Sequence, residues 1–180
     1  MEYTHNYDSP LGGITMASDG TAVTGLWFRG QKNYAETLAY EHEEKPLPVF
    51  AESDRWLDIY FAGRKPDFKP PLSLNNVKAS AFRRAVWEIL LTIPYGQIMT
   101  YGEIARYLAE QRDLTHISPQ AVGGAVGHNP ISLLIPCHRV VGTHGSLTGY
   151  AGGIDRKLSL LTLEKADTSL FFIPSASSAQ

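Results

Sequence analysis

The chain has a single cysteine, no long apolar run and almost no net charge. One cysteine, Cys137, cannot form an internal disulfide or a zinc site made of several thiolates. No apolar run approaches the roughly 20 residues that a membrane-spanning helix needs, and residues 1–6 lack the basic and apolar regions of a secretory signal. A net charge of -2 argues against binding nucleic acid through bulk charge, although a local basic patch is compatible with it. A lone thiol is stable in a reducing compartment, so we expect a cytoplasmic protein.

The rest of the composition is that of a soluble globular protein, with 43% hydrophobic and 19% charged residues. A chain of 180 residues can form one domain or two small ones. Residues 64–78 contain three prolines and little periodicity, which favours a domain boundary there. We therefore expect an N-terminal domain with its linker at 1–78, a second domain at 79–165, and a tail at 166–180 whose last residues, 175–180, fray.

The N-terminal domain is expected to be a small α/β unit. Two runs rich in β-forming residues, 14–17 and 22–28, are separated by turn residues and follow another turn at 8–13. This pattern predicts three strands joined by turns within the first thirty residues, and hence a three-stranded sheet. Residues 53–63 then predict a short helix that is capped by Ser53 and ends at Gly63.

From residue 79 the apolar positions follow a helical period. A first helix should end at Pro94, and Thr100 with Glu103 forms a capping box that opens a second helix through about residue 110. Ser118, which precedes a proline, is the predicted N-cap of a third helix at 120–126, and a last helix is expected at about 155–164. Two short helices joined by a polar turn and packed on a longer helix indicate a helix-turn-helix unit. The fold class is therefore α+β, with a helical second domain.

The predicted helix at 120–126 consists almost wholly of Ala, Val and Gly. Its two glycines each cost about 1 kcal/mol of helix propensity. Close packing between helices is one explanation of this composition. The other is that a slim helix fits a DNA groove that is too narrow for long side chains.

Cys137 follows an apolar run at 131–135 and precedes His138 and Arg139. A lone cysteine is either a buried, inert side chain or a nucleophile, and the polar neighbours favour the second. A nucleophilic thiol needs a base, but adjacent residues of an extended segment point to opposite faces, so His138 requires a turn or a bridging water. Glu164, at the end of the last predicted helix, is a candidate to orient His138 in the manner of a triad. The alternative interpretations are that His138 is a structural histidine and that Glu164 is a surface carboxylate.

Four short segments of the second half form a specific pattern. They are 121–125 (AVGGA), 129–130 (NP), 135–141 (IPCHRVV) and 149–153 (GYAGG). In this order, and together with the helix-turn-helix, they resemble the O6-alkylguanine-DNA alkyltransferase family (methylated-DNA–protein-cysteine methyltransferases). The similarity is dense over about residues 79–165 and is only one of layout over the first 78 residues.

The resemblance implies a ribonuclease H-like N-terminal domain and a winged-helix-like helix-turn-helix in the second domain. It implies a DNA repair protein that flips a damaged nucleotide out of the duplex and moves the alkyl group of O6-alkylguanine, and less efficiently of O4-alkylthymine, irreversibly to its own cysteine. The implied partner is double-stranded DNA, bound through the minor groove by a monomer, with cooperative binding left open. No cofactor and no metal site are expected, and residues 1–78 contain no cysteine for the zinc site of some relatives.

The resemblance also implies roles for single residues. Cys137 is the alkyl acceptor, His138 is the base that acts through a water, and Glu164 orients His138. Asn129 braces the turn before the active-site strand, and Tyr101 contacts the flipped nucleotide and helps to protonate the leaving guanine. The DNA- and base-binding residues that it implies are Thr100, Gln120, Ala121, Gly123, Ala125, Arg139, Val140, Tyr150 and Ala151.

Gln120 departs from the family pattern, because better-known members carry an arginine there that fills the space of the extruded base. Flipping is therefore expected to be weaker or to use neighbouring residues. Sequence-independent affinity should come from phosphate contacts and depend on salt. The candidate phosphate partners are Arg83, Arg84, Arg139 and Lys157, with a structural role as the alternative for Arg139.

Two other functions compete with alkyl-acceptor repair. A module that only binds lesions or regulates DNA would leave Cys137 idle and would need neither His138 nor Glu164. A multiple-turnover cysteine hydrolase is the other alternative. An adjacent Cys and His and a helix-turn-helix of small residues argue against it. Turnover separates the hydrolase from the repair protein, which should stop at one equivalent.

Overall fold

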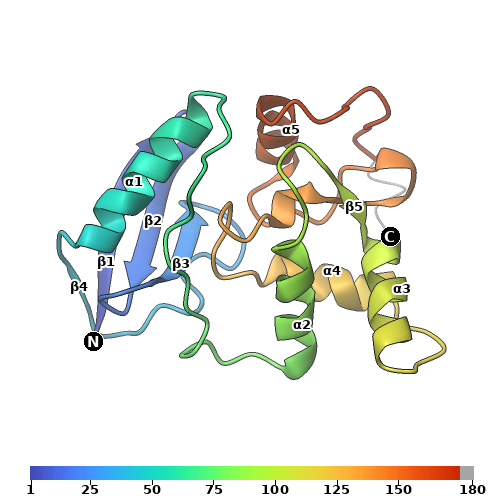
Figure 1. Cartoon of the computed structure of the whole chain (residues 1–180), viewed down its shortest axis with the longest axis horizontal. Coiled ribbons are helices and arrows are strands. Elements are labelled where there is room, and N and C mark those ends of the chain that lie inside the picture. The colour runs from blue at the N-terminus through green and yellow to red at the C-terminus, as the bar shows by residue number, and fades with distance from the viewer. Residues whose placement is uncertain (175–180) are drawn as a thin grey trace. The chain divides into compact units, whose positions relative to one another are not determined.

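A four-stranded sheet is the base of the N-terminal unit in the computed structural model (Figure 1). The structure describes residues 1–174, and this unit comprises residues 1–78 together with 130–134. Its strands are β1 (Glu2–Ser9), β2 (Gly12–Ser18), β3 (Val23–Phe28) and β4 (His42–Glu44), in the order β3-β2-β1-β4. The first three pair antiparallel in sequence order, whereas β4 pairs parallel with β1.

The sheet has one strand more than the three that the sequence predicts. The predicted β-rich runs lie in β2 and β3, whose side chains are mostly buried. Strand β4 is only three residues long, and all three of its side chains are exposed. It therefore has no alternating apolar pattern that sequence reasoning can detect, and only its pairing with the start of β1 defines it.

Helix α1 (Pro48–Phe61) packs against β1 and β2 and begins earlier than predicted. Its N-cap is Leu47, and Pro48 occupies the first helical position, where a missing N–H costs nothing. Ser53 is inside the helix, and its buried hydroxyl donates to the carbonyl of Val49 at 2.7 Å. Proline, rather than serine, was the true start signal. Gly63 follows the helix with φ +78°, as predicted for a left-handed stop.

The second unit is helical and comprises residues 79–129 and the described residues from 135 onward. Its helices are α2 (Ala81–Leu90), α3 (Tyr101–Gln111), α4 (Pro119–Gly127) and α5 (Ile154–Leu163). Two short strands, β5 (Met99–Thr100) and β6 (Val140–Val141), pair parallel, and two 3-10 turns complete the unit, η1 (Cys137–Arg139) and η2 (Thr143–Gly145). Because β5 leads directly into α3 and β6 directly follows η1, this pairing holds Cys137 near the first turn of α3.

The predicted helix starts in this unit are confirmed. The side chain of Thr100 accepts from the N–H of Glu103 at 3.0 Å, and the Glu103 carboxylate accepts from the N–H of Thr100 at 2.9 Å. The side chain of Ser118 accepts from the N–H of Ala121 at 3.0 Å. Both caps satisfy backbone donors that a helix start otherwise leaves unpaired. Helix α2 ends at Leu90, before the predicted stop at Pro94.

Part of the predicted tail packs on the second unit. The N–H of Leu147 donates to the carbonyl of Phe172 at 2.9 Å, and the N–H of Phe172 donates to the carbonyl of Gly145 at 3.2 Å. The side chain of Phe171 packs against a core cluster that includes Leu147 and Leu161. The predicted fraying of residues 175–180 lies outside the described residues. Within residues 1–174, no helix is both long and apolar enough to cross a membrane.

Candidate active site

Cys137 is the first residue of the 3-10 turn η1, and only 3% of its surface is exposed. The N–H of Arg139 donates to the carbonyl of Pro136 at 3.0 Å, which closes the turn. In a 3-10 turn, successive side chains are about 120° apart rather than on opposite faces as in a strand. The backbone therefore provides the turn that a cooperation of Cys137 and His138 requires.

Glu164 joins His138 and Arg139 into one buried cluster. His138 Nε2 lies 2.5 Å from Glu164 Oε2, and Arg139 Nε donates to Glu164 Oε1 at 2.7 Å. The N–H of Gly96 donates to the same Oε1 at 3.0 Å, and Arg139 Nη1 donates to the carbonyl of Ile93 at 2.7 Å. The side chains of His138 and Glu164 have no exposed surface. Such a buried carboxylate is stable only because each of its oxygens accepts hydrogen bonds.

Burial keeps His138 neutral, whereas hydrogen bonds and charges keep Glu164 ionised. Burial raises the pKa of Glu164, but the hydrogen bonds and charges of His138 and Arg139 outweigh burial and hold it well below its usual range. Burial lowers the pKa of His138, and the positive charges of Arg139 and Lys157 add to this against the opposing effect of Glu164. A neutral imidazole whose Nε2–H donates to a carboxylate presents Nδ1 as a proton acceptor. His138 thus rests in the form that a general base needs.

Asn129 braces the backbone ahead of the thiol. It follows α4, is buried, and its Nδ2 donates to the carbonyl of Ile135 at 2.8 Å. The bond spans the segment between α4 and η1, which is the geometry expected for a bracing asparagine.

Two tyrosines belong to the surroundings of Cys137. The hydroxyl of Tyr101, at the start of α3, donates to the carbonyl of Thr148 at 2.7 Å. Burial raises the pKa of both Tyr101 and Tyr150, and the negative charge of Cys137 raises each further. Both phenols therefore remain protonated at neutral pH. Among the described residues, the buried hydroxyl of Tyr150 has no hydrogen-bond partner.

The structure corrects the predicted phosphate contacts. Lys157 has no exposed surface, and its Nζ donates to the carbonyl of Thr148 at 2.9 Å. Arg139 is 9% exposed and is held by Glu164 and Ile93, so its alternative, structural role is the one that the geometry supports. The sequence could not reveal that Arg139 and Lys157 are buried, because their burial depends on hydrogen-bond partners elsewhere in the chain. Arg83 and Arg84 are half-buried on the first turn of α2.

Helix α4 presents one packed face and one exposed face. Val122, Ala125 and Val126 are buried, and the indole of Trp87 donates to the carbonyl of Ala125 at 2.8 Å. This corrects the prediction of Ala125 as a DNA contact. The exposed face carries Gln120, Ala121 and Gly124.

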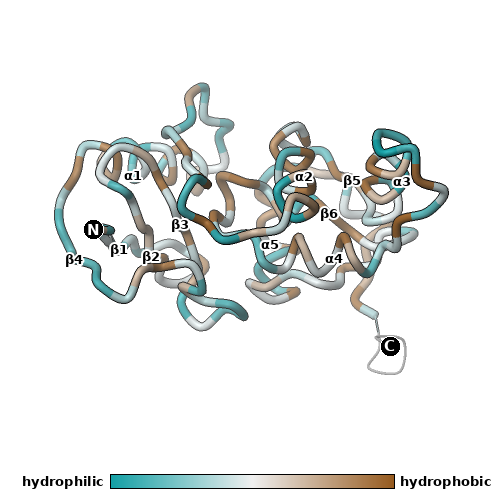
Figure 2. The backbone as a smooth tube through the Cα atoms, turned by 90° about the horizontal axis from the view of Figure 1, so that it is seen from below, coloured by the Kyte–Doolittle hydropathy of each residue, from teal (hydrophilic) through white to brown (hydrophobic). Residues whose placement is uncertain are grey.

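Sequence reasoning missed Gly124. A Cβ atom added to this glycine would have no other atom within 4 Å. Gly123 is half-buried beside the ring of Tyr101. Close packing therefore explains the small residues of the buried face, and the fit of the exposed face to a DNA groove stays a prediction. In Figure 2 the helix is drawn in pale to light-brown shades, in keeping with its small, weakly apolar residues.

The other predicted base-pocket residues are placed around η1. Val140 is buried and follows the turn directly, and Thr100 uses its hydroxyl to cap α3. Ala151 is half-buried next to Tyr150. Within residues 1–174, no group of three or more His, Cys, Asp or Glu side chains is arranged to hold a metal ion.

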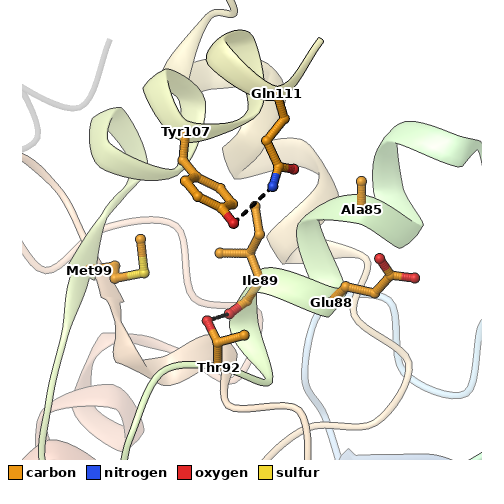
Figure 3. Close-up of a pocket in the computed structure, with 7 residues that line it drawn as sticks. All are labelled: Ala85, Glu88, Ile89, Thr92, Met99, Tyr107 and Gln111. Carbon is orange, nitrogen blue, oxygen red and sulfur yellow. Dashed lines mark hydrogen bonds between the residues drawn. The ribbon is translucent and has the colours of Figure 1, made fainter.

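A separate pocket of about 410 Å³ lies between α2 and α3 (Figure 3). The amide of Gln111 donates to the hydroxyl of Tyr107 at 2.8 Å along the α3 wall of this pocket, and Glu88 is among the α2 residues that line it. None of the candidate catalytic residues lines this pocket. Its exposed carboxylate, Glu88, provides a matched control for changes to Glu164.

Glu164→Gln should lower the free energy of unfolding at pH 7 by about 3 kcal/mol, because it leaves the Arg139 guanidinium buried without its counter-charge. Since the pKa of Glu164 is lowered by folding, its carboxylate stabilises the fold above the ordinary glutamate pKa, and this contribution is lost as the pH falls toward the folded value. The loss in the variant should therefore be full at pH 7 and shrink below about pH 4. Urea unfolding at pH 7 and below about pH 4 measures this loss of unfolding free energy, with Glu88→Gln as control. Equal losses at both pH values would contradict this assignment.

Both halves of the chain match models of one protein family. Residues 3–74 match the family model described as 6-O-methylguanine DNA methyltransferase, ribonuclease-like domain. Residues 81–166 match the model described as 6-O-methylguanine DNA methyltransferase, DNA binding domain. The two models thus correspond to most of the described sequence.

Curated relatives agree with these matches. The methylated-DNA–protein-cysteine methyltransferase of Mycobacterium tuberculosis is 41% identical over 175 residues, which cover 95% of this chain and 99% of the relative. The protein of that name from Haemophilus influenzae is 40% identical over 166 residues, covering 92% of this chain and 87% of the relative.

Solved structures give the same result. A crystal structure of the M. tuberculosis O6-methylguanine methyltransferase is similar with a TM-score of 0.76 at 41% identity, covering 92% of this chain and 93% of that one. A crystal structure of the M. tuberculosis OGT in complex with DNA gives a TM-score of 0.75 at 40% identity, covering 91% and 92%. With both domains matched and relatives of this identity along nearly the whole length, the chain belongs to the 6-O-methylguanine DNA methyltransferase family.

Proposed function

We propose that this protein repairs alkylated DNA by moving the alkyl group of O6-alkylguanine, and less efficiently of O4-alkylthymine, onto its own Cys137. The observation that carries the proposal is the buried Cys137 on the same tight turn as a neutral His138 that is held by Glu164. A relative of 41% identity is named a methylated-DNA–protein-cysteine methyltransferase, and a similar protein has been crystallised with DNA. The single thiol also favours work in the reducing cytoplasm.

The first chemical step is removal of the thiol proton. His138 accepts it at Nδ1 through a bridging water, and the Glu164 carboxylate stabilises the imidazolium that forms. The thiolate then attacks the alkyl carbon in line with the carbon–oxygen bond. The product is a thioether, and no group in the cluster reverses that bond. One chain therefore acts once.

The damaged base must leave the stack to reach this thiol. Only 3% of the surface of Cys137 is exposed, so an atom inside a stacked duplex is out of its reach. Tyr101 stays protonated and can donate to the guanine as it leaves, while the ring of Tyr150 lines the base pocket with Val140 and Ala151. Asn129 holds the preceding backbone in place.

DNA binding is proposed through the exposed face of α4. Gln120, Ala121 and Gly124 form a slim surface that suits the minor groove, with Gly123 and Thr100 nearby and Arg83 and Arg84 as phosphate contacts. No base-specific contact is needed, because repair must work at any sequence. We propose a monomer as the active form. In this arrangement residues 1–78 serve as a scaffold domain, residues 79–165 carry DNA binding and alkyl transfer, and residues 166–180 form a C-terminal extension.

Intact mass spectrometry tests the proposed function. The protein is mixed with excess duplex that carries one O6-methylguanine, and we expect each chain to gain one methyl group on the peptide that contains Cys137, with no further gain over time. Cys137→Ala should abolish the gain yet retain binding to the duplex in a gel-shift assay. A methyl group transferred by the Cys137→Ala variant would refute the acceptor assignment, and lesion-selective binding without any transfer by the wild type would favour a lesion-binding protein.

Gln120→Arg should speed transfer from duplex DNA by about tenfold, because a longer, charged side chain fills the space of an extruded base better. Transfer from the free base O6-methylguanine needs no flipping and should be unchanged. Single-turnover rate constants with both donors measure the effect, and Gln111→Arg, an exposed position on α3, controls for the added charge. Equal acceleration with both donors would remove the link between Gln120 and flipping.

A further inference from the structure

The segment between α2 and β5 contacts the Arg139–Glu164 ion pair at three points, and the proposed chemistry gives this segment no task. The carbonyl of Ile93 accepts from Arg139 Nη1 at 2.7 Å, and the N–H of Gly96 donates to Glu164 Oε1 at 3.0 Å. Between these two residues along the chain lies Tyr95, whose ring centroid is 5.8 Å from Cζ of Arg139. Figure 1 shows the segment reaching toward α5.

A tight turn holds Tyr95 in this place. The N–H of Gln97 donates to the carbonyl of Pro94 at 3.0 Å, so Tyr95 and Gly96 are the two central residues of the turn. Gly96 has a φ of +77°, and a Cβ atom added to it would lie 2.9 Å from the backbone oxygen of Glu164. Only glycine fits this position without strain. The turn is therefore packed against Glu164 at one residue and presents the ring of Tyr95 at the residue before.

The ring of Tyr95 is suited to cover a cation. A guanidinium within about 6 Å of an aromatic centroid is attracted by the negative face of the ring, and more strongly when water is excluded. Arg139 is buried and Tyr95 is half-buried, so the ring lies between the guanidinium and the solvent. Burial and then the negative charge of Glu164 raise the pKa of Tyr95, whereas the charge of Arg139 lowers it. The phenol is thus within electrostatic reach of both members of the ion pair.

The place of Arg139 matters for the base of the site. The charged groups that act on His138 are Glu164 and Lys157 from α5 and Arg139 from η1, with Cys137 next to it on the same turn. Burial lowers the pKa of His138 and Arg139 lowers it further, while Glu164 opposes both. If Arg139 left Glu164 for the solvent, His138 would lose a repelling charge and face the whole carboxylate. The imidazole would then stay protonated to higher pH, and an imidazolium cannot accept the thiol proton.

We propose that Tyr95 is a positioning residue for the alkyl transfer, because its ring holds the Arg139 guanidinium on Glu164 and so keeps His138 available as a base. This inference rests on the proposed function, in which His138 accepts the thiol proton. The aromatic face carries the role and the hydroxyl does not. Phenylalanine or tryptophan should therefore replace Tyr95, whereas leucine, which is apolar but has no aromatic face, should not.

The pH dependence of thiol reactivity tests this role without DNA. Carbamidomethylation of Cys137 by iodoacetamide is followed from about pH 5 to about pH 9, a range that spans the ordinary pKa of histidine. The variants are Tyr95→Leu, Tyr95→Phe and Tyr95→Trp. The matched control is Tyr107→Leu, which changes an exposed tyrosine of α3 that lines the separate pocket (Figure 3). Urea unfolding of each variant shows that it is folded.

We expect Tyr95→Leu to move the acidic limb of the profile upward by about one pH unit, so that it reacts about tenfold more slowly than the wild type on that limb. At the alkaline end the two rates should agree. Tyr95→Phe, Tyr95→Trp and Tyr107→Leu should keep the wild-type limb. An unchanged profile for Tyr95→Leu, the same shift in Tyr95→Phe, or a loss by one factor at every pH would overturn the inference.

Two further outcomes are decisive. If Tyr95→Leu does not fold, the phenylalanine and tryptophan variants decide: wild-type limbs in both support the role of the ring, and a raised limb in either overturns it. A wild type that gains no methyl group from an O6-methylguanine duplex would refute the proposed function. The iodoacetamide profiles would still show whether Tyr95 controls the basicity of His138, so the two failures are distinguishable.

Discussion

The buried carboxylate of Glu164 is the interaction on which the site depends. It stands at the C-terminal end of α5 and accepts hydrogen bonds from three other groups: His138, Arg139 and the backbone N–H of Gly96. It therefore fixes the turn that carries Cys137, the segment before β5 and the end of α5 to one point. Without the Arg139 guanidinium, the His138 imidazole and the amide, burial of the carboxylate would cost several kcal/mol. The same bonds orient the imidazole that the thiol requires.

A second consequence concerns the balance of charge around Cys137. Burial lowers the pKa of His138 and the charge of Arg139, which also compensates Glu164, lowers it further, so the imidazole rests neutral and ready to accept a proton. Lys157 is buried as well, and the negative charge that Cys137 gains on losing its proton raises the pKa of Lys157 against the effect of burial.

The sequence predicted the parts of the fold that local chemistry controls. Caps at Thr100 and Ser118 depend on side chains next to the helix start, and both are present as expected. The pair of His138 and Glu164 could be proposed because a buried carboxylate needs a partner. The turn at Cys137 was recognised as necessary, but the sequence left open whether the turn or a bridging water would serve.

What the sequence missed depends on tertiary contacts. Strand β4 has no apolar pattern, and the inward course of the Arg139 and Lys157 side chains depends on partners in distant segments. Ala125 looked like part of a groove-binding helix face, yet packing against α2 decides its burial. Small residues give no local signal of which face is exposed.

The most direct test of the account is the reactivity of the only thiol in the chain. Carbamidomethylation of Cys137 by iodoacetamide at pH 7 is measured for the wild type, Glu164→Gln and Glu88→Gln, without DNA. The account predicts that the wild type and Glu88→Gln react at the same rate and that Glu164→Gln reacts about 100-fold more slowly, because its imidazole has lost the carboxylate that stabilises it as a base. Equal rates for all three proteins would contradict the claim that Glu164 and His138 activate Cys137.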